Sequence, residues 1–168
     1  MKSFLQYAAA SLMEAVYPPR CLACNRFLPR LPRRSKARPG PAGWGDGYLS
    51  RSQFIRIMQP VLCRRCAADF TPVSFPLCDK CGMMFAGREG INHWCGRCRE
   101  FSVPFDSARA VGLYQGPLMT VIHKLKYTHH LALAKPLGRA LFHGLCCWYD
   151  SSAVDLVLPV PLHRRKFR

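Results

Sequence analysis

Eight cysteines arranged as four Cys-x-x-Cys pairs are the residues of this sequence with the clearest chemical potential. Thiolate sulfur is a preferred ligand of soft and borderline metal ions, and a two-residue gap lets both sulfurs of one tight turn face the same ion. Two such turns complete a tetrahedral shell of four thiolates. The pairs are Cys21/Cys24, Cys63/Cys66, Cys78/Cys81 and Cys95/Cys98.

The residues around the four pairs indicate an internal repeat. Asn25 and Gly82 follow the first and third pairs, and both residue types tolerate the positive φ that such turns often require. Leu62 and Trp94 precede the second and fourth pairs, which we interpret as closing turns. We therefore predict two zinc ribbons in series, the first two pairs forming one site and the last two the other. A crossed arrangement, first pair with third and second with fourth, stays open.

Four thiolates fit structural zinc better than the alternatives. Disulfides are disfavoured because the sequence shows no secretory signal and cytosolic thiols stay reduced. A thioredoxin-type redox site would use one pair on a βαβ background. An iron–sulfur cluster takes the same ligands and is the remaining alternative. We predict two structural Zn²⁺ ions, His93 as a weaker candidate ligand, and Cys146 and Cys147 as buried packing residues outside the sites.

The composition excludes several protein classes. The chain has 168 residues, enough for one ordinary domain or two small ones, and its 49% apolar content argues against full disorder. No uncharged apolar run is long enough for a membrane span. Residues 1–18 are predicted to form an amphipathic helix, with Leu5, Ala8 and Leu12 at helical spacing, and not a signal peptide. We therefore expect a cytoplasmic protein.

The charge points to a polyanionic partner. Lys and Arg number 25 against 9 Asp and Glu, a formal net charge of +16. A Pro- and Gly-rich basic insert covers about residues 30–58, and a second basic cluster, 163–168, contains Arg164 and Arg165 as candidate phosphate contacts. Such clusters favour non-specific, salt-sensitive binding to nucleic-acid backbones. The alternative is a solvated basic surface that serves solubility only. No base-reading helix is evident.

The second half of the chain has a different pattern. Residues 108–114 are predicted as a strand, and a helix is expected from the Gly116-Pro117 turn to Tyr127. A second helix is expected over 131–149, kinked or started late at Pro136, and a buried strand over 155–161. Together these predict a right-handed α/β crossover. The expected organisation is the helix 1–18, a small, β-rich double zinc ribbon over 19–102 and an incomplete α/β domain over 105–168.

The order of these segments resembles the ComF family of competence-related proteins. A double zinc ribbon is followed by FDSARAVGLYQGPLMTVIHKLKY (105–127), LALAKPLGRAL (131–141) and DLVLPVPLHRRKFR (155–168). The resemblance implies a type I phosphoribosyltransferase-like domain after the ribbons and an accessory role in DNA uptake or DNA handling.

The resemblance is incomplete where the family binds its substrate. The family's phosphoribosyl-pyrophosphate loop, with two adjacent acidic residues and a Thr-Thr-Gly turn, has no counterpart here. We therefore expect a C-terminally incomplete chain that is not catalytic as it stands. The alternatives are a phosphoribosyltransferase whose loop lies in a missing part, and a zinc-ribbon module that docks a protein. We also expect that a protein partner or a second chain could complete the α/β sheet of residues 105–168.

Overall fold

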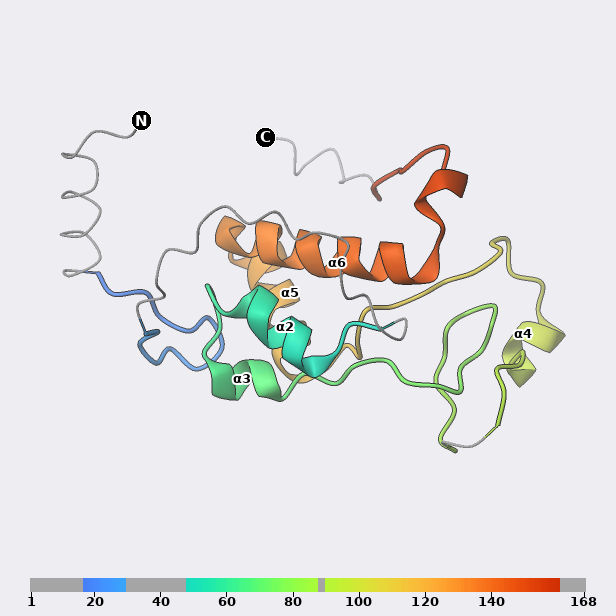
Figure 1. Cartoon of the computed structure of the whole chain (residues 1–168), viewed down its shortest axis with the longest axis horizontal. Helices are drawn as coiled ribbons and strands as arrows, with labels where there is room; N and C mark the ends of the chain where they lie inside the picture. Colours follow the sequence, from blue (N-terminus) through green and yellow to red (C-terminus); the bar gives the residue numbers. More distant parts are fainter. Residues whose placement is uncertain (1–16, 30–47, 88–89, 161–168) are drawn as a thin grey trace.

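The computed structural model describes residues 17–29, 48–87 and 90–160 (Figure 1). The structured elements in this part of the chain are helical. They are α2 (Arg51–Met58), α3 (Arg64–Ala68), α4 (Gly96–Glu100), α5 (Gly116–Tyr127), the 3-10 turn η1 (Leu131–Leu133), α6 (Ala134–Trp148) and the 3-10 turn η2 (Ser151–Ala153). The predicted helix over 1–18 and the basic cluster 163–168 fall almost entirely outside the described residues.

The predicted fold class, a β-rich double zinc ribbon followed by an α/β phosphoribosyltransferase-like domain, is wrong for the residues that the structure describes. In these three ranges no segment forms a strand of a sheet, and strand-like pairing is confined to two isolated antiparallel bridges. Those bridges join Arg20 to Phe27 and Leu77 to Met84. The described chain is therefore helix and coil, and the expected α/β crossover is not formed.

Neither predicted strand forms, and the physical reason is the same for both: in the described residues no neighbouring strand pairs with them. Over 108–114 the backbone bonds to loops instead: the Ala108 N–H donates to the Lys80 carbonyl and the Leu113 N–H to that of Thr71. The segment 155–160 has no regular secondary structure, and its Leu156 and Val160 side chains are 71% and 92% exposed. An apolar run predicts a buried strand only if a second strand accepts its hydrogen bonds, which periodicity does not reveal.

The two predicted helices are confirmed. Helix α5 carries Pro117 in its first turn, where the missing N–H breaks no helical hydrogen bond, and buries Leu118 and Val121. The second helix begins with η1 and continues as α6. Pro136 lies in the first turn of α6, so it marks a late start and not a kink.

Helix α2 was not predicted, because it lies inside the basic insert expected over about 30–58. Its start is a capping box: Ser50 accepts from the Gln53 backbone at 3.2 Å, and the Gln53 side chain accepts from the Ser50 N–H at 2.8 Å. The helix places Phe54 and Met58 in the core with no exposed surface. The Phe54 ring stacks on that of Phe70 at a centroid distance of 3.9 Å.

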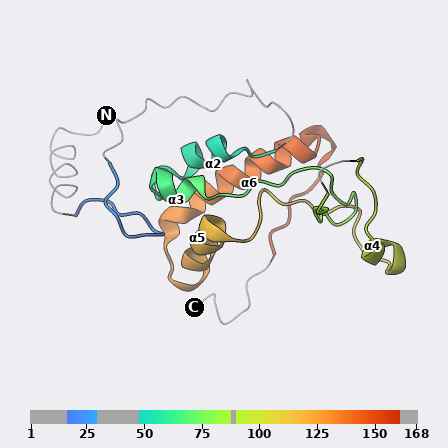
Figure 2. The same ribbon diagram turned by 90° about the horizontal axis from the view of Figure 1, so that it is seen from below.

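The main core lies among α2, α3, α5 and α6, which are grouped in both ribbon views, while α4 lies apart at one end (Figures 1 and 2). The 3-10 turn η1 contacts α5 and α6. This core contains two of the paired cysteines, Cys21 and Cys63. A second, small cluster is formed by the third and fourth pairs with Phe85. The two clusters share no residue, so each group of cysteines has its own hydrophobic surroundings.

Two glycines of α6 provide a matched test of this packing. A Cβ at Gly144 would overlap Cγ1 of Val111, whereas a Cβ at Gly138 would meet nothing within 4 Å. We expect Gly138→Ala to stabilise the protein by about 0.5–1 kcal/mol through helix propensity. In Gly144→Ala, overpacking should lower the free energy of unfolding by about 1–3 kcal/mol, and the higher helix propensity of alanine should offset part of this loss. Urea denaturation of both variants measures the difference, and equal stabilisation would contradict the close packing of α6 on Val111.

Candidate metal centres

The structure brings the eight paired cysteines into two tetrads. In each tetrad the four sulfur atoms lie within 4.8 Å of one another. The arrangement is the uncrossed one, in which the first pair joins the second and the third joins the fourth. Tetrad 1 contains Cys21, Cys24, Cys63 and Cys66, and tetrad 2 contains Cys78, Cys81, Cys95 and Cys98.

The opening pair of each tetrad lies in a tight turn closed by one of the isolated bridges. The Cys21 N–H donates to the Arg26 carbonyl at 2.7 Å, and the Cys78 N–H donates to that of Met83 at 2.8 Å. The chain reverses through a residue of positive φ, 60° at Asn25 and 71° at Gly82. The prediction that these two positions require left-handed backbone is confirmed.

The closing pair of each tetrad lies at the start of a short helix. Cys63 and Cys95 occupy the N-cap positions of α3 and α4, and Cys66 lies within α3 one turn further on. The Cys66 N–H points at the Cys63 sulfur at 3.5 Å, and the Cys95 N–H points at the Cys78 sulfur at 3.3 Å. Each tetrad therefore combines a tight turn with the start of a short helix.

The spacing of the sulfurs fits a tetrahedral metal site. The Cys24 and Cys63 sulfurs are 3.7 Å apart, and those of Cys81 and Cys95 are 3.8 Å apart. Four thiolates at about 2.3 Å from a central Zn²⁺ would be separated by about 3.8 Å. The tetrads could thus each hold one metal ion, and the four-thiolate donor set is consistent with zinc.

The surroundings prepare one sulfur of each tetrad for ionisation. Burial by itself raises the pKa of the Cys21 thiol, but backbone N–H groups of neighbouring residues bring the pKa down to about 6. The same balance brings the pKa of Cys78 to about 6. Burial and hydrogen bonds to the other sulfurs raise the pKa of Cys66, and that of Cys98 to about 12. One thiolate in each tetrad is therefore available at neutral pH, and a bound cation would favour ionisation of the others.

The other candidate residues lie outside the tetrads. His93 stacks on Phe85 at a centroid distance of 4.1 Å and bonds the Ile91 carbonyl through Nδ1. Cys147 is half-buried, with its sulfur 3.3 Å from His143 Nδ1, but Cys146 is exposed, so its predicted burial is wrong. Arg164 and Arg165 lie outside the described residues.

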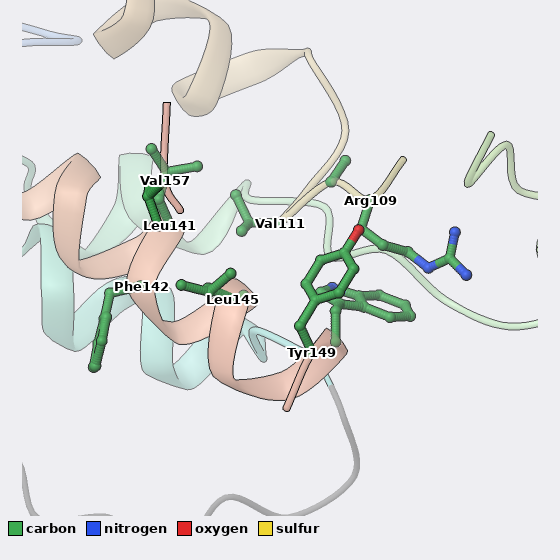
Figure 3. A pocket seen from close by; sticks show the side chains of 10 residues that line it. Arg109, Val111, Leu141, Phe142, Leu145, Tyr149 and Val157 are labelled. Atoms are coloured by element: carbon green, nitrogen blue, oxygen red, sulfur yellow. The ribbon is translucent and has the colours of Figure 1, made fainter. Parts of the chain in front are cut away.

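A pocket of about 330 Å³ lies between α6 and the segment around Val111 (Figure 3). Leu141 and Val157 stand at one end and Arg109 and Tyr149 at the other. The Arg109 guanidinium lies 5.2 Å from the centroid of the Trp148 ring, at the same end. The lining is almost wholly apolar, so the pocket offers a surface for packing and no nucleophile or acid–base pair.

Sequence reasoning missed a row of exposed aromatic rings along α5. The His123 ring lies 6.0 Å from that of Tyr114 and 5.4 Å from that of Tyr127. The spacing of His123 and Tyr127, four residues apart in a predicted helix, was the available signal. Tyr114 precedes the helix and joins the row only through the tertiary fold.

None of the helices in the described residues combines the length and the apolar character needed to cross a membrane.

Similar proteins include one named DNA utilization protein YhgH from Salmonella typhi, 31% identical over 93 residues. The protein of the same name from Salmonella typhimurium (strain LT2) is 30% identical over 93 residues. Each alignment covers 54% of this chain and 40% of the relative, so the chain spans about 40% of the length of the curated relatives that it matches. No family model and no solved structure matches the chain.

Proposed function

We propose that this chain is a zinc-stabilised accessory protein of DNA uptake or DNA handling, related to the ComF proteins that its sequence resembles. The observation that carries this proposal is the similarity to proteins named for DNA utilization. The two cysteine tetrads and the strong positive charge are independent features that agree with it.

In this proposal the tetrads hold two Zn²⁺ ions with a structural role. All four positions of each ion would be filled by thiolates, which leaves no open coordination site for catalysis. Each ion would join the turn that carries the opening pair of cysteines to the short helix that carries the closing pair. A cytoplasmic location would keep the ten cysteines reduced and able to bind metal.

The DNA contact would be made through phosphates and would be independent of base sequence. Eight thiolates and two Zn²⁺ would lower the formal charge from +16 to about +12, which leaves the protein strongly basic. The excess of positive side chains extends into the described residues, since 107–149 contains Lys and Arg but no Asp or Glu. Such a surface attracts a phosphate backbone by releasing its counterions.

We expect the zinc-loaded protein to bind DNA with an affinity that falls steeply with salt. Fluorescence anisotropy of a labelled oligonucleotide at several salt concentrations measures this. Four or five phosphate contacts would give a slope of about −4 for the logarithm of the binding constant against that of salt. A basic globular protein of the same size and net charge is the control. Binding no tighter than the control would refute the proposal.

A second candidate function is docking of a protein partner. Apolar side chains of α6 and the following segment are largely exposed, and patches of this kind often mark interaction sites. They are Leu141, Phe142, Leu156, Val157, Leu158 and Val160. Absence of DNA binding in the experiment above would make this candidate the stronger one.

A further inference from the structure

The aromatic row is formed by Tyr114, which precedes α5, and by His123 and Tyr127 of the helix, and it is open to solvent. The Tyr114 and Tyr127 side chains are 57% and 65% exposed, and His123 is exposed between them. The ring planes of Tyr114 and His123 meet at 50°, and those of His123 and Tyr127 at 89°. An edge-to-face contact covers one face of one ring only, and the high exposure of Tyr114 and Tyr127 leaves ring surface open for stacking.

The row is held in place from beneath. Leu118 and Val121, on the other side of α5, are buried in the main core, so the helix cannot turn its outer face. Tyr114 lies in a loop tied to Thr71 on both sides. The Leu113 N–H donates to the Thr71 carbonyl, and the Gln115 side chain donates to the Thr71 hydroxyl at 3.0 Å. A ligand would find the rings already positioned, which reduces the entropic cost of binding.

The charge on α5 and on the residues that follow it favours an anion, and the nearby acidic residue Asp69 lies at the opposite, N-terminal end of the helix. Lys124 and Lys126 lie in the last turn of α5 and are the sequence neighbours of His123 and Tyr127, and His129 and His130 follow the helix. Helix α5 contains no acidic residue, and neither does the wider segment 107–149. Aromatic faces next to cations, with no carboxylate on the same element, are the two features that proteins combine to bind a nucleic-acid strand.

We propose that Tyr114, His123 and Tyr127 form a platform on which unpaired nucleobases stack, while Lys124 and Lys126 contact the phosphates between them. This inference rests on the proposed DNA-handling function and adds to it a strand preference and a location. Within a duplex each base face is covered by the next base pair, so an unpaired base can stack on a protein ring without the cost of opening a base step. Stacking tolerates any base, which agrees with binding independent of sequence.

The test compares an oligothymidylate with a duplex of the same length by fluorescence anisotropy. The double variant Tyr114→Ala/Tyr127→Ala should bind the single strand at least about tenfold more weakly, with less than about twofold change for the duplex. Tyr114→Phe/Tyr127→Phe keeps the rings and should bind as the unmodified protein does. Tyr17→Ala removes a tyrosine that is 74% exposed outside the row and is the matched control.

A second measurement uses the unmodified protein and does not depend on the folding of any variant. A strand of abasic sites carries the same phosphates without bases and should bind about tenfold more weakly than oligothymidylate. Equal binding of the two strands, or an alanine pair with native zinc content that binds oligothymidylate normally, would overturn the platform. Failure of the unmodified protein to bind any DNA would instead reject the proposed function.

Discussion

Replacing Cys21 by serine is expected to unfold the helical core of this protein. Cys21 is 1% exposed and packs in the same cluster as Leu62 and Phe70. The turn that carries it is tied to the α2–α3 connection, where the Leu22 N–H donates to the Val61 carbonyl at 2.9 Å. If tetrad 1 holds the proposed zinc ion, its loss would therefore release α3 and the N-terminal turn from the core together.

The size of this effect follows from the energy of structural metal binding. Zinc contributes roughly 10–16 kcal/mol to the folding of small four-ligand sites at pH 7. The total free energy of unfolding of a typical domain is about 5–15 kcal/mol. Loss of a zinc site that is part of the core would therefore remove as much free energy as the whole fold has. We expect Cys21→Ser to lose most of its far-UV circular dichroism and its cooperative denaturation.

The control for this variant is Cys146→Ser, which changes an exposed cysteine outside both tetrads. It should keep two zinc ions per chain by native mass spectrometry and denature as the unmodified protein does. A Cys21→Ser protein that loses one zinc ion but keeps its helical signal and denaturation midpoint would show that tetrad 1 does not support the core. Iron in place of zinc would contradict the choice of metal.

The local features of the tetrads were predictable because short-range geometry determines them. A two-residue gap brings two sulfurs together in any tight turn, and Asn25 and Gly82 mark the residues that must adopt positive φ. Pro117 and the apolar spacing after it were likewise enough to locate α5. None of these features depends on residues far away in the chain.

The strands were not predictable because their existence depends on a neighbour. The run from Leu156 to Val160 has the composition of a buried strand, yet its side chains are exposed in coil. Helix α2 was missed although its start carries a local signal, the Ser50–Gln53 capping box. The basic, Pro- and Gly-rich residues before it led us to assign the whole segment to a loop. The stacking of Phe54 on Phe70, which anchors α2, is a tertiary contact that no local pattern reports.

Tetrad 2 should respond to the same substitution in a different way. Its hydrophobic surroundings are three buried cysteines with Cys81 and Phe85, and none of these residues belongs to the main core. Within the described residues α4 lies away from the other helices (Figure 2). We therefore expect Cys78→Ser to unfold only the segment around tetrad 2, about residues 76–101, and to leave α2, α5 and α6 folded.

Hydrogen exchange followed by mass spectrometry measures both parts of this prediction. In Cys78→Ser, amides of 76–101 should exchange at least about a hundredfold faster, because a segment that has lost its metal keeps almost no apolar core. Amides of α5 and α6 should exchange at their original rates, and one zinc ion should remain. Faster exchange throughout α5 and α6 would mean that the two tetrads fold as one unit. The backbone bond from Ala108 to Lys80 would be the connection to examine, since it joins the tetrad 2 turn to the segment that packs on α6.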